Sequence, residues 1–146
     1  IDKHLTTWYT PAMTEARYRK NAGCVYNLHL HFVWCPKYRK KVLHGKVAER
    51  LKELLHEKAV ALNVEVEGLE IMPDHVHLFV SVPPTDAPQY FANQFKGYTS
   101  RVLRQEFAHL RTGLPCLWSR SYYVEATGHV SAETIQKYIE SQKVRN

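Results

Sequence analysis

The feature that most constrains the fold is a short segment in which two histidines alternate with apolar residues. It reads Pro73-Asp74-His75-Val76-His77, continues as Leu-Phe-Val, and ends shortly afterwards at two consecutive prolines. Successive side chains of a β-strand point to opposite faces, so this alternation places both histidines on one face, roughly 6–7 Å apart. The segment therefore predicts a strand that packs into a core on one side. On its other side it presents two imidazoles that could hold one metal ion or one phosphate.

Three further periodic segments accompany this strand in the first half of the chain. Residues 25–35 alternate apolar and polar side chains with a period of two and end at a proline, which predicts a strand. Residues 47–62 repeat leucine and valine at helical spacing with charges between them, which predicts a helix. Residues 64–71 predict a further strand, in which Gly68 is a candidate bulge.

The second half of the chain predicts two more helices and one more strand. Asp86 and Pro88 suit the N-cap and the first turn of a helix, residues 118–125 suit a strand, and residues 132–142 suit a final helix. The order β-α-β-β-α-β-α predicts an α+β fold, a ferredoxin-like or RRM-like antiparallel sheet with an added C-terminal helix. Because such sheets host many functions, the fold alone does not decide what the chain does.

Length and composition predict one soluble globular domain. The chain has 146 residues, of which 45% are hydrophobic and 23% are charged. We expect residues 21–146 to form the domain and residues 1–20 to be an extension, disordered or vector-derived, with Met13 as a candidate native start. No apolar run approaches the roughly 20 residues of a membrane helix, and no export signal is visible. Three cysteines without a C-x-x-C spacing then favour reduced thiols and a cytoplasmic location.

The positive charge of the chain has two possible meanings. The formal net charge is +6, which fits either a solvated basic surface or an electrostatic footprint for nucleic acid. Nine tyrosines add rings that could stack on unpaired bases. The residues that we expect to contact DNA phosphates are Lys37, Arg39, Lys40, Lys41, Lys96, Arg101 and Arg104.

Two other groups of side chains could join the histidine pair. Tyr138 and Gln142 are four residues apart, so they share one face of the final helix. A lone helical tyrosine is usually a core residue, but a glutamine one turn later on the apolar side needs a partner. A second histidine pair, His29 and His31, lies on the first strand. Either histidine pair alone is more often a satisfied polar pair than a set of ligands.

The histidine segment resembles the HUH motif, in which U is a hydrophobic residue, of the single-tyrosine transposases of small bacterial insertion sequences that move as single-stranded DNA. Four further blocks carry the same resemblance in the same order, at residues 31–39, 95–100, 117–124 and 136–142. The resemblance implies that His75 and His77 bind Mg²⁺ or Mn²⁺, that Gln142 supplies a third metal ligand, and that Tyr138 is the nucleophile. The C-terminal helix would then be the catalytic helix.

The resemblance also implies the reaction and the partners. The enzyme would cleave and rejoin single-stranded DNA at element ends marked by hairpins, through a 5′-phosphotyrosine intermediate. It would act as a homodimer whose active sites can combine side chains from both chains. We expect neither a nucleotide cofactor nor binding to a membrane. The base that deprotonates the tyrosine is not identified, since His129 and Glu133 fit surface or capping roles better.

Three alternatives stay open at this point. A domesticated relative would use the same chemistry to process chromosomal repeats. A metal-free phosphoesterase would use the two histidine pairs as acid and base and would need no tyrosine. A non-catalytic module would bind single-stranded DNA on its sheet without cleaving it.

Overall fold

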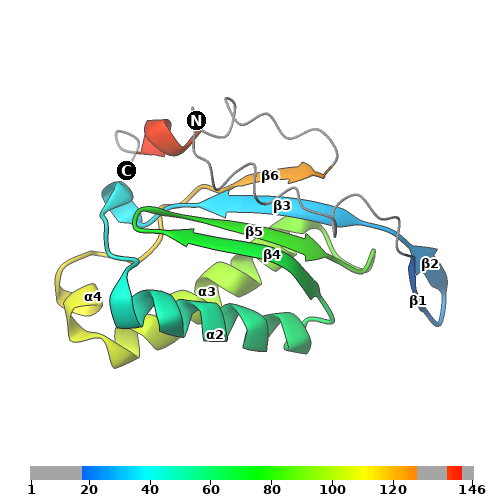
Figure 1. Cartoon of the computed structure of the whole chain (residues 1–146), viewed down its shortest axis with the longest axis horizontal. Helices are drawn as coiled ribbons and strands as arrows, with labels where there is room; N and C mark the ends of the chain where they lie inside the picture. The colour runs from blue at the N-terminus through cyan, green and yellow to red at the C-terminus, as the bar shows by residue number, and fades with distance from the viewer. Residues whose placement is uncertain (1–17, 128–137, 143–146) are drawn as a thin grey trace.

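The computed structural model describes residues 18–127 and 138–142 of the chain. Its centre is a four-stranded antiparallel sheet in the order β4-β5-β3-β6. The strands are β3 (His29–Trp34), β4 (Glu65–Met72), β5 (His75–Ser81) and β6 (Tyr123–Ala126). Helices α2 (Gly45–Ala61) and α3 (Pro88–Glu106) cover one face, and the helical segment of residues 138–142 lies over the other (Figure 1).

This arrangement confirms the predicted ferredoxin-like fold. Along the chain the main elements run β3-α2-β4-β5-α3-β6, which is the expected β-α-β-β-α-β order. The histidine strand β5 is central, because it pairs with β3 on one side and with β4 on the other. The predicted bulge is also confirmed, since the pairing of β4 with β5 shifts register between Val66 and Gly68.

The core lies between the sheet and the two long helices. Alternate residues of the two central strands face these helices and are buried. These residues are Phe32, Trp34, Val76, Leu78 and Val80. A smaller cluster on the opposite face contains Val33, Cys35 and Ile139. Both faces of β5 are therefore covered. Within the described residues, no helix is long and apolar enough to cross a lipid bilayer.

The N-terminal part of the described chain differs from the single strand predicted for residues 25–35. The chain first forms a separate hairpin of β1 (Arg19–Asn21) and β2 (Cys24–Tyr26), and β3 begins only at His29. Strands of three residues are too short to show a period in the sequence. Arg19 donates to Ser81 at the end of β5 and pairs with Glu65, so the hairpin is tied to the sheet. Residues 1–17 of the expected extension lie outside the described residues.

Two predicted boundaries in the second half of the chain need correction, and one short helix is additional. The N-cap of α3 is Ala87, while the Asp86 carboxylate accepts a hydrogen bond from Thr85. The strand predicted from residue 118 is interrupted: Trp118 forms an isolated antiparallel bridge with Pro36, and the regular strand β6 begins only at Tyr123. A short helix, α4 (Ala108–Thr112), follows α3 and was not predicted. Of the predicted final helix, residues 138–142 are described and are helical.

Candidate active site

The two histidines of β5 lie side by side on the sheet face that carries the 138–142 segment. The centroids of the His75 and His77 rings are 4.9 Å apart, and the ring planes are nearly perpendicular, at 86°. Both side chains are buried. Alternation along β5 explains this placement, since the intervening Val76 packs under the helices on the other face. The two imidazoles are therefore close enough to meet a single ion.

His75 is held by a carboxylate that is itself held by a guanidinium. The Nδ1 of His75 donates to Oδ1 of Asp74 over 2.7 Å, and Nε of Arg39 donates to Oδ2 of Asp74 over 2.7 Å. Burial opposes ionisation of Asp74, but hydrogen bonds from His75 and Arg39 outweigh it and lower the pKa of this carboxyl to about 2. In the neutral imidazole this hydrogen bond places the proton on Nδ1 and the lone pair on Nε2, and Nε2 is buried without a hydrogen bond to any described residue.

His77 is held by a third histidine, His31 of the neighbouring strand. Nε2 of His31 lies 3.1 Å from Nδ1 of His77, and the His31 ring stacks on Phe79 with centroids 4.0 Å apart. Burial lowers the pKa of His31 to about 3, so its ring is neutral at physiological pH. A neutral, buried imidazole positions its neighbour and is a poor general acid. His29 does not join it, since its ring bonds to Glu67 and Asn27.

The 138–142 segment brings Tyr138 and Gln142 to the same face. Ile139 anchors the segment by packing against Val33 and Cys35 of the sheet. The Tyr138 hydroxyl lies 3.1 Å from Oγ of Ser121, which in turn donates to Oε1 of Gln142 over 2.8 Å. The tyrosine and the glutamine therefore meet at one serine, beside the sheet face that carries the histidines.

A Ser-x-Ser segment that the sequence reasoning gave no role makes this junction. Ser119 also donates to Oε1 of Gln142, over 3.1 Å. Lys96 supports the segment from behind, since its Nζ lies 2.8, 3.4 and 3.0 Å from the carbonyl oxygens of residues 119, 120 and 121. Burial lowers the pKa of Lys96 to about 8. The signal available in the sequence was two serines spaced by two, directly before the last strand.

The basic residues expected to contact DNA fall into two groups. Three of them use their charged groups inside the chain, namely Lys96, Arg39 and Arg104, whose guanidinium donates to the carbonyls of Arg111 and Leu114. The others have more accessible charges: Lys40, Lys41 and Arg101 are exposed, and Lys37 lies beside the exposed ring of Tyr38. Arg39 and Lys96 hold groups beside the site, Arg104 holds the segment that follows α3, and the second group remains available to a ligand.

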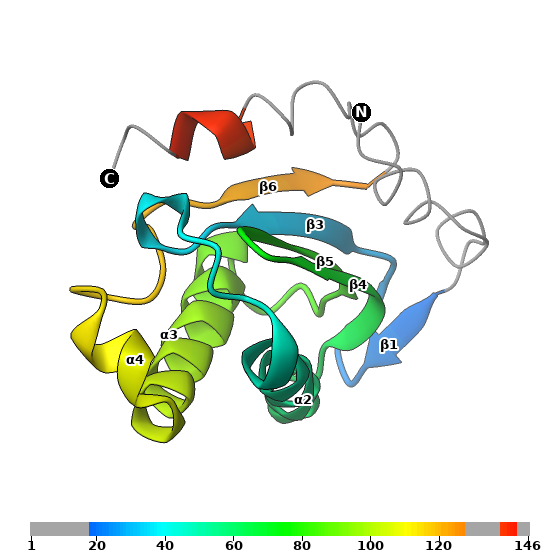
Figure 2. The ribbon, with the colours of Figure 1, turned by 60° about the vertical axis from the view of Figure 1, so that its left-hand side comes forward.

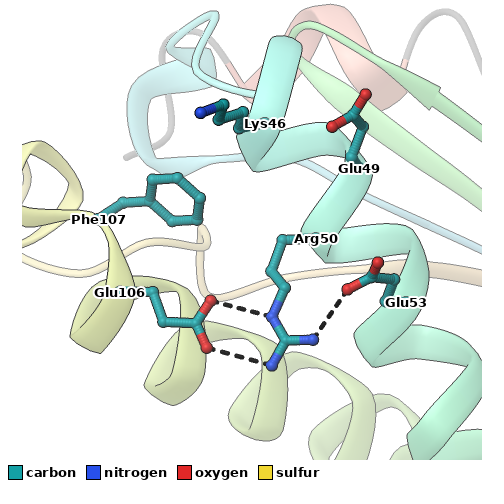
Figure 3. Close-up of a pocket in the computed structure, with 6 residues that line it drawn as sticks. All are labelled: Lys46, Glu49, Arg50, Glu53, Glu106 and Phe107. Carbon is teal, nitrogen blue, oxygen red and sulfur yellow. Dashed lines mark hydrogen bonds and ion pairs between the residues drawn. The ribbon is translucent and has the colours of Figure 1, made fainter.

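A charged pocket on the helical side of the molecule is separate from this site. It lies between α2 and the end of α3, has a volume of about 270 Å³, and contains Arg50 and Glu106 among its lining residues (Figure 3). The guanidinium of Arg50 bonds to both carboxylate oxygens of Glu106 and to Glu53. The charges of Arg50, Glu53 and Glu106 in this pocket are therefore paired within the chain, and we assign the pocket no ligand.

The donor set beside the histidines fits a divalent metal ion. The buried Nε2 of His75 offers a lone pair. The His77 ring lies edge to face with the His75 ring, and Gln142 is a buried amide on the same face of the sheet. Imidazole nitrogen and amide oxygen are ligands that Mn²⁺ and Mg²⁺ accept. No group of three His, Cys, Asp or Glu side chains that could hold a metal is found among the described residues.

Sequence comparisons place the chain among transposases. A family model described as "Transposase IS200 like" matches residues 24–142. The ISDra2 transposase TnpA of Deinococcus radiodurans is 40% identical over 126 residues, which cover 85% of this chain and 90% of the relative. The transposase for insertion sequence element IS200 of Salmonella typhimurium is 30% identical over 119 residues, covering 80% and 78%.

Two solved structures share the fold. The first, a Deinococcus radiodurans R1 protein described as a transposase, superimposes with a TM-score of 0.76 at 38% identity and covers 85% of this chain and 97% of its own. The second, a REP-associated tyrosine transposase bound to a REP hairpin, gives a TM-score of 0.53 at 13% identity and covers 86% and 69%. The second likeness supports the fold alone.

Proposed function

Because the chain belongs to the family of IS200-like transposases, which cut DNA and transfer the cut strand, we propose that Tyr138 is its nucleophile and that single-stranded DNA is its substrate. Family membership confirms the resemblance carried by the five sequence blocks. The observation that carries the proposal is the meeting of Tyr138 and Gln142 at Ser121, on the sheet face of the histidine pair. This arrangement supports the proposal because it brings a candidate nucleophile and three candidate ligands from distant segments to one face of the sheet.

The proposed reaction is a pair of phosphoryl transfers. The Tyr138 phenolate oxygen bonds to the scissile phosphorus, the bond from phosphorus to the 3′ oxygen breaks, and that oxygen leaves as a 3′-hydroxyl after taking a proton. The DNA is then joined to the enzyme through a 5′-phosphotyrosine. A 3′-hydroxyl later attacks the same phosphorus, releases Tyr138 and restores a phosphodiester. Since one ester replaces another, no nucleotide triphosphate is required.

The metal site is part of the same proposal. His75, His77 and Gln142 would hold Mg²⁺ or Mn²⁺, which supplies Lewis-acid chemistry at phosphoryl oxygens. The chain's own contribution is orientation: Asp74 fixes the tautomer of His75, and His31 contacts the ring nitrogen of His77 that lies nearer the backbone. Such supporting contacts hold metal-binding imidazoles in place.

The form of the DNA and the assembly follow from the family resemblance. We expect recognition of hairpins near element ends and a homodimer whose active sites can be shared between chains. The candidate phosphate contacts are the exposed Lys40, Lys41 and Arg101 and the half-buried Lys37. Curated relatives that belong to insertion sequences favour a mobile element over a domesticated repeat-processing role.

A cleavage assay tests the nucleophile and the metal together. Wild-type protein, a hairpin oligonucleotide with a single-stranded 5′ flank, and Mn²⁺ should give a protein–DNA adduct on a denaturing gel. Tyr138→Phe should give none, because it lacks the attacking oxygen. Tyr90→Phe, which changes an exposed tyrosine of α3, is the matched control and should behave as wild type.

Each alternative predicts a different result in this assay. A metal-free phosphoesterase would cleave in EDTA and in the Tyr138→Phe variant. A binding module would shift the oligonucleotide on a native gel and give no product with any metal. Either outcome would overturn the proposal.

A further inference from the structure

The direction of the hydrogen bonds around Gln142 is fixed by the chemistry of the groups. An amide oxygen can only accept, so both Ser119 and Ser121 must donate their hydroxyl protons to Oε1 of Gln142, over 3.1 and 2.8 Å. The Ser121 hydroxyl has a single proton, and this proton is already donated to Gln142. Its Oγ must therefore accept the proton of the Tyr138 hydroxyl, 3.1 Å away. The network runs from tyrosine to serine to glutamine.

This network occupies the atom that a metal ion would need. An amide oxygen has two lone pairs, and the two serine hydroxyls take both. We propose that Ser119 and Ser121 compete with the metal ion for Gln142, an inference that rests on the assignment of Gln142 as a metal ligand. Loading the site then requires Gln142 to leave at least one serine.

The serines are fixed firmly enough to act as competitors. Ser119 is 1% exposed, and its backbone N–H donates to the carbonyl of Cys35 over 2.9 Å. Lys96 holds the three backbone carbonyls of the segment, and the preceding Trp118 donates through Nε1 to Thr99 of α3 over 3.0 Å. Exchange therefore moves the Gln142 side chain while the serines stay in place.

The exchange also links the metal site to the nucleophile. If Ser121 loses Gln142 as its acceptor, its hydroxyl can rotate, and the hydrogen bond from Tyr138 is no longer directed by the glutamine. Ser121 is thus a positioning residue that acts on the nucleophile and on the third ligand at once. A serine with a purely structural role would support Gln142 and would raise metal affinity by its presence.

The sign of the change in metal affinity separates the two roles. Ser119→Ala and Ser121→Ala, made separately in the full chain without DNA, each remove one competitor. Titration with Mn²⁺ followed by electron paramagnetic resonance should show affinity about threefold to tenfold higher than wild type, the range expected for one net hydrogen bond. Ser121→Thr keeps the hydroxyl and should match wild type, as should Ser100→Ala on α3.

A second readout needs no metal. In metal-free protein, hydrogen–deuterium exchange of residues 138–142 should be faster in both alanine variants, because the segment loses an anchor. Unchanged or lower Mn²⁺ affinity in an alanine variant that melts like wild type would overturn the inference. Gln142→Ala distinguishes the failures: wild-type Mn²⁺ affinity in that variant would remove Gln142 from the ligand set and so contradict the proposed function itself.

Discussion

At the scale of single residues, the site depends on side chains that hold other side chains. The clearest case is Asp74, which accepts from His75 on one oxygen and from Arg39 on the other. Asp74→Asn keeps the shape and removes the charge that makes the His75 ring a better electron donor. We expect Mn²⁺ affinity to fall about tenfold, the lower end of what such supporting contacts contribute.

Calorimetric titration of Mn²⁺ into the two proteins measures this difference. Glu49→Gln makes the same chemical change at an exposed position of α2 and should leave the affinity unchanged. Equal affinities in wild type and Asp74→Asn would show that the carboxylate does not support the metal site.

Lys96 gives a prediction about pH. Burial lowers its pKa from 10.5 to about 8, so between these values the unfolded chain holds a proton that the folded chain has lost. The free energy of unfolding therefore gains a contribution from Lys96 that rises with pH in this window, by at most about 1.4 kcal/mol per pH unit. Lys96→Met should lack this contribution.

Urea unfolding of both proteins at pH 7, 8, 9 and 10 checks the sign, because other groups cancel in the difference between them. Relative to Lys96→Met, the wild type should gain stability above pH 8 and show little relative change between pH 7 and 8. A relative loss above pH 8 would mean that the three carbonyl acceptors outweigh burial.

At the scale of elements, the 138–142 segment packs on the sheet through a buried apolar side chain. Ile139 is 1% exposed and packs against Val33 and Cys35. Ile139→Ala removes this anchor, at a cost of about 2–4 kcal/mol to the docked state. Because the docked state becomes less populated, we expect the yield of protein–DNA adduct to fall by about tenfold or more. The melting temperature should change little, since the main core lies on the other face of the sheet.

Adduct gels and thermal melts on the same preparations measure the two effects. Val60→Ala, at a position of α2 that is 82% exposed, is the matched control and should leave both unchanged. Full adduct yield in Ile139→Ala would show that this anchor is not needed for attack.

Periodicity in the sequence predicted the elements whose two sides differ over many residues. The helix of residues 47–62 and the histidine strand are of this kind, and both are found within one or two residues of their expected bounds. The start of β6 was not predictable in this way. In the sequence, residues 119–121 resemble the beginning of a strand. In the structure, their carbonyl oxygens accept hydrogen bonds from Lys96 of α3, and a local sequence pattern does not show a contact with a distant element.

The same limit applied to the candidate site. His75, His77, Tyr138 and Gln142 could be proposed from motifs, since each has a characteristic local spacing. The roles of Ser119, His31 and Lys96 depend on side-chain contacts across the sheet, and local spacing contains no information about them.

At the scale of the whole molecule, the sheet separates stability from chemistry. One face carries the large core under α2 and α3, and the other carries the histidines, Tyr138 and Gln142. The basic turn η2 (Lys37–Arg39) lies at the same end of the sheet as the 138–142 segment, as both ribbon views show (Figures 1 and 2). Arg39 ties that turn to Asp74, which places the exposed Lys40 and Lys41 next to the site.

This placement predicts how DNA binding depends on salt. A protein that neutralises phosphates of a single strand loses affinity as salt is added. The logarithm of its Kd rises with the logarithm of the salt concentration, with a slope of roughly 0.7 per phosphate contacted. Replacing Lys40 and Lys41 together by alanine should therefore make the slope shallower by about 1.4 if each lysine contacts one phosphate. Replacing Lys52 and Lys58 of α2, on the other side of the sheet, removes the same charge and should change the slope far less. Fluorescence anisotropy with a labelled oligonucleotide between about 50 and 300 mM salt, a range that brackets physiological ionic strength, gives both slopes. Equal changes in the two double variants would mean that overall charge, and not the basic turn beside the histidines, attracts the strand.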